Sequence, residues 1–153
     1  MTSRADYFNL APQAMQILLQ QEDYLRAQFN SSEILNIKLW ELVKLRVSQI
    51  NQCAFCIDMH SKDALNLGET NERILGLNAW RDMPHYSDLE RTALDWAEHL
   101  TRGQPVNDQR YQDLVRVLGE KGVVDLTLAI NAINSWNRVA KTFKPEVGSY
   151  KPN

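Results

Sequence analysis

The stretch that decides the fold is LNIKLWELVKLRVSQI, residues 35–50. Wound as a helix, it places apolar side chains on nearly every side. They are Leu35, Ile37, Leu39, Trp40, Leu42, Val43, Leu45, Val47 and Ile50. A helix that is apolar all round is buried rather than half exposed. We therefore predict that this segment is a central helix around which the rest of the chain packs.

Residues typical of helix starts and ends occur on both sides of this segment. Pro12 suits the first turn of a helix, Gly68 suits the end of one, and Ser87 and Glu90 have the spacing of a capping box. No convincing alternating strand pattern is found. We expect helices over residues 12–29, 35–50, 53–67, 70–80, 88–100, 108–118 and 123–143, followed by an extended segment over 144–153. The prediction is an all-α single domain of about seven helices spanning residues 1–153.

Composition narrows the function classes. The chain has 153 residues and 17.7 kDa, with 17 Lys plus Arg against 19 Asp plus Glu. No basic block stands out, so the electrostatic signature of a nucleic-acid binder is missing. Neither a secretory leader nor an apolar run of the ~20 residues that cross a bilayer is recognised. We therefore expect a cytoplasmic protein without nucleic-acid or membrane partners.

Two predicted helices, 35–50 and 123–143, are apolar on most faces. A monomer of this size has little other structure with which to bury so much apolar surface. This favours a homo-oligomer, with the Pro-containing segment 144–153 reaching over a neighbouring subunit. The alternative is that seven helices packed together bury both faces within one chain.

The first feature that points to chemistry is Cys53-Ala54-Phe55-Cys56. If a helix begins near Cys53, then Cys56 lies in the first turn, where free backbone N–H groups favour a thiolate. His60 lies one turn further along the same face. An imidazole there can accept the thiol proton or pair with the thiolate.

Glu41 is the fourth member of this group. It lies ten residues before Asn51, and His60 lies nine residues after it. In an antiparallel hairpin turning at Asn51, both come to about 15 Å from the turn. Ser48, on the Glu41 face, falls at the height of the cysteines. The sequence thus predicts a carboxylate, an imidazole and two thiols in a row.

Other interpretations of single residues stay open. The cysteines can be structural or half of a zinc site, although His85 and His99 lie on unrelated segments and a four-ligand set is not apparent. We expect Lys44 and Arg46 to point outward with their charges in water, the alternative being that they point inward and favour the thiolate. Most tryptophans suit the core. Whether Trp136, Asn137 or Arg138 lines the thiol site is left open by the sequence.

Residues 41–64, from Glu41 to Ala64, resemble the core of the AhpD-like alkylhydroperoxidases of the carboxymuconolactone decarboxylase superfamily. The shared pattern is a Glu, eleven residues, Cys-x-x-Cys, three residues and a His. The resemblance extends loosely over residues 12–150. Known members place a histidine before the second cysteine, where this chain has Phe55.

The resemblance implies a thiol-dependent peroxidase that reduces hydrogen or organic hydroperoxides. Cys56 matches the peroxidatic cysteine, Cys53 the resolving cysteine, and Glu41 and His60 the proton relay. It also implies an external dithiol reductant, which can be a protein-bound lipoyl group, and assembly as a trimer or hexamer. No bound cofactor or metal is expected, and no nucleotide-binding glycine motif is found.

Two other functions remain as alternatives. The cysteine pair can sense oxidation without fast peroxidase turnover. Glu41 and His60 can instead serve a decarboxylase or lyase acting on a lactone acid, as in superfamily members without the cysteine pair. The identity of the peroxide is not readable from the sequence.

Overall fold

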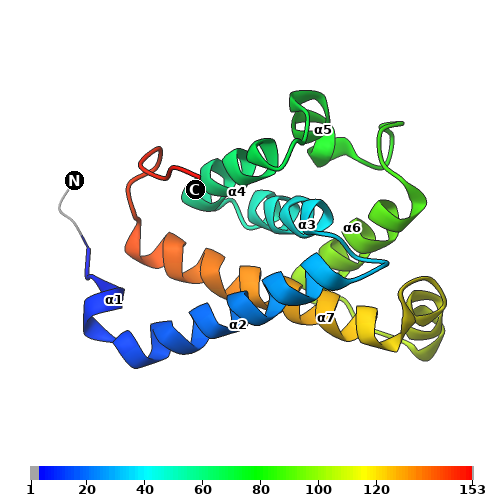
Figure 1. Ribbon diagram of the computed structural model, residues 1–153, viewed down its shortest axis with the longest axis horizontal. Coiled ribbons are helices and arrows are strands. Elements are labelled where there is room, and N and C mark those ends of the chain that lie inside the picture. Colours follow the sequence, from blue (N-terminus) through cyan, green and yellow to red (C-terminus); the bar gives the residue numbers. More distant parts are fainter. Residues whose placement is uncertain (1–3, 153) are drawn as a thin grey trace.

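The computed structural model describes residues 4–152 and is built from helices, with no strand in that range (Figure 1). The helices are α1 Tyr7–Leu10, α2 Pro12–Ser31, α3 Ile37–Ile50, α4 Ala54–Asn66, α5 Asn71–Gly76, the 3-10 turn η1 Leu77–Ala79, α6 Asp88–Thr101 and α7 Asp108–Phe143. The predicted all-α architecture is confirmed. None of the helices described is long and apolar enough to cross a membrane.

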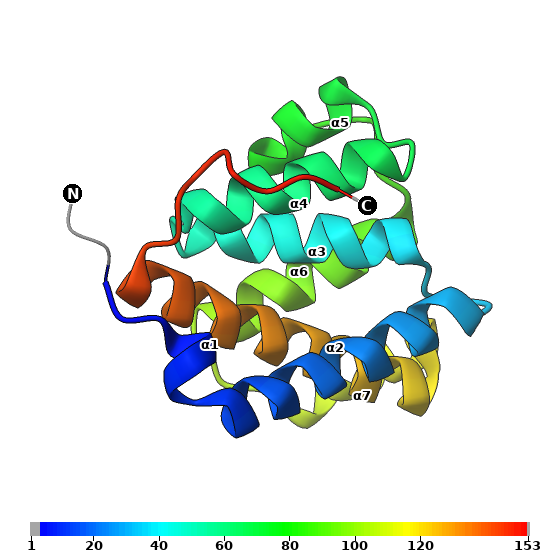
Figure 2. The same ribbon diagram turned by 60° about the vertical axis from the view of Figure 1, so that its left-hand side comes forward.

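Helix α3 is the centre of the molecule, in contact with α4, α6 and α7 (Figures 1 and 2). It begins at Asn36, whose side chain accepts a hydrogen bond from the Leu39 amide at 2.9 Å. Every residue from Leu39 to Ser48 is buried within the single chain. The apolar surface of α3 therefore needs no neighbouring subunit, and the argument for an oligomer from this helix was wrong. The oligomeric state itself stays a prediction.

Helices α3 and α4 form the predicted hairpin. Asn51 ends α3, and Gln52 adopts a positive φ of 54° that reverses the chain. The Cys53 amide then donates to the Ser48 carbonyl at 3.0 Å. From α7, the Oδ1 atoms of Asn134 and Asn137 each accept a hydrogen bond from the Asn51 side-chain amide at 2.9 Å. The turn that sets the height of Glu41 against His60 is thus fixed from outside the hairpin.

The predicted helix boundaries hold to within two residues, with three larger differences. The segment predicted as 70–80 is a short α-helix continued by the 3-10 turn η1. Residues 108–118 and 123–143 are joined in one long element, interrupted where Gly119 takes φ 70° and ψ 162°. The break falls at the predicted glycine, but the helix resumes earlier than expected. Helix α1, capped by Asp6, was not predicted, because a four-residue helix has almost no periodicity to detect.

The segment after α7 is extended, as predicted, but it lies on α4 of its own chain (Figure 2). Lys144, with φ 52°, ends α7 and turns the chain back. The Lys62 side chain donates to the Tyr150 carbonyl at 3.0 Å, which ties the segment down. The segment is thus held by its own chain, and the expectation that it also reaches a neighbouring subunit stays a prediction. Asn153 lies outside the described residues.

Candidate active site

The cysteine pair lies at the beginning of α4. Cys53 is the N-cap residue and Cys56 is in the first turn, and both are buried. Their sulfur atoms are bonded, 2.15 Å apart, so the structure describes the oxidised pair. No side chain caps this helix end. Its first-turn amides and the helix dipole therefore favour a negative charge on sulfur once the pair is reduced.

Glu41 on α3 and His60 on α4 face each other as the hairpin geometry predicts. Glu41 Oε2 and His60 Nδ1 are 2.9 Å apart, and both side chains are buried. His60 follows Cys56 by four residues, so the two lie on the same face of α4. The structure thus places carboxylate, imidazole and cysteine pair in the predicted order.

Lys44 is part of this group, and the expectation that it points outward was wrong. Its Nζ atom lies 2.5 Å from Glu41 Oε1 and 3.5 Å from the centre of the Trp40 ring. A carboxylate and an aromatic face inside the protein replace the water that the ammonium would otherwise seek. Although burial works in the opposite direction, the hydrogen bond with His60 and the charge of Lys44 lower the pKa of Glu41. Glu41 is therefore a carboxylate at neutral pH.

Arg46 is also buried, contrary to expectation, on another side of α3. Its Nε donates to Glu98 Oε1 at 2.8 Å, and the Trp80 indole donates to the same oxygen at 2.8 Å. This group, defined by Arg46, Trp80 and Glu98, is called the Glu98 network below. Its members are not those around the cysteine pair.

Sequence reasoning missed two polar residues near the Glu41–His60 pair. One carboxylate oxygen of Asp63 lies within 4.8 Å of a Glu41 oxygen and a His60 ring nitrogen. The Tyr150 hydroxyl donates to Asp63 Oδ1 at 2.7 Å. Asp63 was detectable, because it follows His60 by three residues on one helix face. Tyr150 was not, because it comes from a segment far along the chain.

Glu41, His60 and Asp63 are also the residue types that bind metal ions. The Lys44 ammonium and the Tyr150 hydroxyl already donate to the two carboxylates. A metal ion would have to compete with both donors. The donor set fits a hydrogen-bonded proton network better than a metal centre.

The α7 residues left open by the sequence take supporting positions. Asn137 is fully buried and donates to Ser48 Oγ at 3.0 Å, next to the backbone bond that joins Ser48 to Cys53. The Trp136 indole donates to Glu22 on α2, and Arg138 donates to the carbonyl of Asn134. The α7 residue that packs against the buried cysteines is Ala140. Asn137 thus supports the hairpin, while the polar groups of Trp136 and Arg138 are engaged elsewhere.

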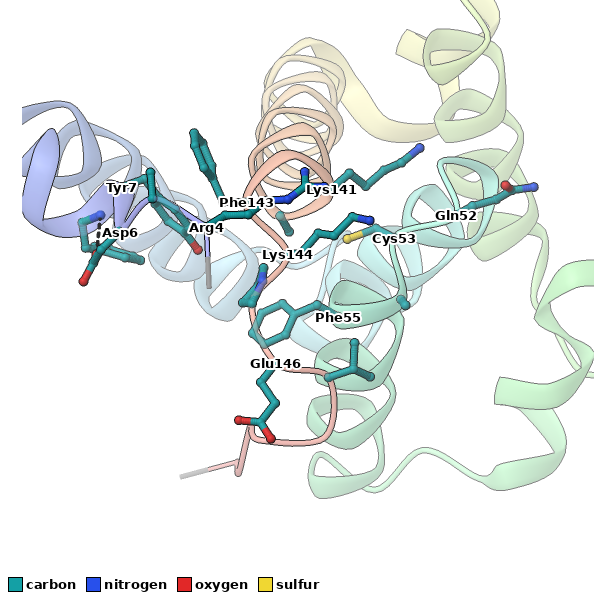
Figure 3. A pocket seen from close by; sticks show the side chains of 16 residues that line it. Arg4, Asp6, Tyr7, Gln52, Cys53, Phe55, Lys141, Phe143, Lys144 and Glu146 are labelled. Carbon is teal, nitrogen blue, oxygen red and sulfur yellow. Dashed lines mark hydrogen bonds between the residues drawn. The ribbon is translucent and has the colours of Figure 1, made fainter. Parts of the chain in front are cut away.

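A cavity of about 1180 Å³ opens beside Cys53, between the N-terminal segment, the start of α4 and the end of α7 (Figure 3). Phe55 forms part of its wall, and charged residues of both signs line it, among them Lys141, Lys144 and Glu146. Cys56 is not among the lining residues. The two sulfur atoms therefore have different surroundings: Cys53 meets the cavity, and Cys56 shares a helix face with His60.

The fold and the site together define an all-α protein whose central hairpin joins a Cys-x-x-Cys pair to a buried Glu–His pair. The chain belongs to the carboxymuconolactone decarboxylase family, which it matches over residues 13–99, and it is an AhpD-like member of it. It is 42% identical to the uncharacterized protein YdfG of Bacillus subtilis, over 92% of this chain and 93% of that one.

Solved structures agree with this assignment. A protein of unknown function from Agrobacterium tumefaciens, put forward as an antioxidant defence protein AhpD, is 31% identical, with a TM-score of 0.84 over 97% of this chain and 100% of that chain. The debrominase Bmp8 shares the fold alone, at 15% identity, with a TM-score of 0.79 over 93% of this chain and 75% of that one. Proteins of this fold thus include enzymes of more than one kind.

Proposed function

We propose that this protein is a thiol-dependent peroxidase that reduces hydrogen peroxide or organic hydroperoxides through Cys56 and Cys53. The observation that carries the proposal is the continuous arrangement of the bonded cysteine pair, His60 one helical turn further, and Glu41 2.9 Å from His60. A redox pair and a proton donor are the two parts that peroxide reduction needs.

In the reduced protein, the Cys56 thiolate attacks one oxygen of the peroxide and the O–O bond breaks. Cys56 becomes a sulfenic acid, and the departing alkoxide or hydroxide takes a proton from His60, which Glu41 holds in place. The Cys53 thiol then attacks the sulfenic sulfur, releasing water and forming the disulfide that the structure contains. The peroxide has gained two electrons, and both have come from the cysteine pair.

An external dithiol, for which a protein-bound lipoyl group is one candidate, completes the cycle. Its thiolate approaches through the cavity and attacks Cys53, the cysteine on the cavity wall. The S–S bond breaks and Cys56 leaves as a thiolate, which the uncapped start of α4 stabilises. The second thiol of the reductant then releases Cys53 and becomes oxidised itself. No bound cofactor takes part in this cycle.

The proposal also includes the cellular location and the oligomeric state of the protein. A cycle that depends on an external dithiol suits a reducing compartment, so we place the protein in the cytoplasm. We also propose a homo-oligomer, a trimer or hexamer as the family resemblance implies. Leu10, Ile17 and Leu75 support it, because 73%, 66% and 82% of these apolar residues stay exposed in the single chain.

The experiment that tests the peroxidase is thiol titration and intact mass of the reduced protein after one equivalent of hydroperoxide. We expect the wild type to lose both thiols rapidly. Cys53→Ser should accumulate a sulfenic acid on Cys56, because the resolving thiol is gone. Cys56→Ser is the matched control, and it should consume no peroxide.

Other outcomes point to the alternatives. Slow oxidation that produces the disulfide without turnover by a dithiol would indicate a redox-sensing protein. Thiols that survive the peroxide untouched would overturn the peroxidase. Glu41 and His60 would then be tested as the acid–base pair of a lyase acting on a lactone acid.

A further inference from the structure

The segment after α7 is fixed to α4 at two places. At the first, the Gly148 amide donates to Asp58 Oδ2 at 3.2 Å, and Lys62 donates to the same carboxylate at 2.8 Å. Lys62 also donates to the Tyr150 carbonyl. These bonds hold the backbone of residues 148–150 against α4 and leave the Tyr150 side chain free to extend toward Asp63 on the same helix.

At the second place, the Tyr150 hydroxyl reaches the face that carries the redox residues. It donates to Asp63 Oδ1 at 2.7 Å. Asp63 follows His60 by three residues and Cys56 by seven, which puts all three on the same side of α4. The hydroxyl therefore bonds to the residue next to the Glu41–His60 pair.

The charges around this contact keep the Tyr150 hydroxyl protonated, so that it can donate a hydrogen bond. Burial, the hydrogen bond to Asp63, and the negative charges of Asp63 and Glu41 raise the pKa of Tyr150 to about 12. Near neutral pH the phenol therefore stays protonated and donates a hydrogen bond to Asp63. The charged or titratable groups that face this corner are Arg26 on α2, Glu41 and Lys44 on α3, and Asp58, His60, Lys62 and Asp63 on α4.

We propose that Tyr150 is a positioning residue of the proton relay: its hydroxyl holds the Asp63 carboxylate in place beside Glu41 and His60. This inference rests on the proposed function. The segment after α7 then completes the active site, because it supplies the donor that offsets the second carboxylate there. Without the hydroxyl, the Asp63 charge acts more fully on His60 and Cys56, and it opposes formation of the Cys56 thiolate.

The test is the rate at which iodoacetamide alkylates Cys56 in the Cys53→Ser protein, measured from pH 5 to pH 9 with Tyr150→Phe added. We expect alkylation about tenfold slower at pH 7, the size of one hydrogen bond to a charged group, and a rising limb displaced to higher pH. The ¹⁵N shifts of the His60 ring, which report the nitrogen that carries the proton, should change as well.

Tyr24→Phe is the matched control. Tyr24 also donates to a carboxylate, Asp125 Oδ1 at 2.9 Å, but between α2 and α7 and outside the Glu41–His60 group. It should leave the alkylation rate within about twofold, as expected of a change away from the reacting sulfur. The proposal is overturned if Tyr150→Phe and Tyr24→Phe have the same alkylation rate, the same pH at which that rate rises and the same ¹⁵N shifts of the His60 ring. A lower melting temperature of Tyr150→Phe would not change that conclusion.

Alkylation needs no peroxide, so the two proposals fail separately. A wild type whose thiols ignore hydroperoxide overturns the peroxidase, and the alkylation profile still decides the role of Tyr150. A wild type that reduces peroxide, joined to an unchanged Tyr150→Phe profile, overturns the role of Tyr150 alone.

Discussion

Helix α3 carries two buried ion pairs that differ in the kind of donor around each carboxylate. Glu41 meets Lys44 and His60, whereas Glu98 meets Arg46, Arg81, Arg102 and the Trp80 indole. The Glu98 donors are guanidinium and indole groups, which only donate hydrogen bonds, whereas the His60 ring has two nitrogens that can each donate or accept one. Under the proposed function, one buried carboxylate holds helices together while the other serves a proton relay, and the difference is the imidazole that contacts Glu41.

The pKa values follow the same division. Although burial works in the opposite direction, hydrogen bonds from Trp80 and Arg46 and the arginine charges lower the pKa of Glu98 from 4.5 to about 2. The pKa of Glu41 is also lowered, through His60 and Lys44. Both side chains are carboxylates in the folded protein, but only Glu41 contacts a side chain that can pass a proton onward.

The largest expected effect is on stability, from Glu98→Ala. Arg46 would keep Gln49 and Asn78 as acceptors but lose its buried counter-charge. Breaking a buried ion pair in this way costs about 3–5 kcal/mol of unfolding free energy. Urea unfolding measures it, and the thiol reaction of the molecules that remain folded should be unchanged.

Arg102→Ala is the matched control for that loss. Arg102 donates to the same Glu98 carboxylate at 2.9 Å, but about half of its side chain is exposed. Removing an exposed partner should cost less than about 1 kcal/mol. Equal losses in the two variants would show that burial does not set the strength of the Glu98 network.

Acid should weaken the Glu98 network over a definite range. Because the folded pKa of about 2 lies below the ordinary 4.5, the contribution of Glu98 is complete above about pH 4.5 and is lost as pH falls toward 2. The loss is of the order of 3 kcal/mol. Urea unfolding at pH 3 and pH 7 should show a smaller difference for Glu98→Gln than for the wild type. An identical difference would contradict the pKa assigned to Glu98.

Glu41→Gln should act on reactivity, beyond any loss of stability from the unpaired Lys44 charge. It keeps the shape of the side chain but removes the charge that orients His60 and pairs with Lys44. A lost acid–base partner slows such steps by about a hundredfold. Stopped-flow measurement of sulfenic acid formation with a hydroperoxide tests this, with Glu98→Gln as the isosteric change in the other pair. Similar rates in both variants would remove the distinction between the two carboxylates.

How much of this was visible in the sequence depended on distance along the chain. The Glu41–His60 contact was predictable, because both residues lie on adjacent helices joined by a short turn with a fixed rise per residue. The Glu98 network and the Tyr150–Asp63 bond join distant segments, which periodicity cannot pair. Lys44 and Arg46 were predicted to point outward because long cations usually keep their charge in water. Their internal carboxylates, and the Trp40 ring beneath Lys44, reversed that preference.

The smallest expected effect comes from the other side of the cysteine pair, at Phe55. Phe55 packs against Cys53, Cys56 and Ala140 and lines the cavity, where the resembling family places a histidine. Phe55→His would add an imidazole beside the thiols, but on the cavity wall and without the buried carboxylate that contacts His60. We expect peroxide reduction to rise by less than about tenfold, below the range of a fully positioned acid–base group.

The double variant Glu41→Gln with Phe55→His separates the two sides of the pair. If the buried relay supplies the proton, the added histidine restores little of the rate that Glu41→Gln removes. Full recovery would show that a proton donor on the cavity side can replace His60. The distinction between the two ion pairs of α3 would then describe how the protein is held together, and the cavity beside Cys53 would be the place where the proton is delivered.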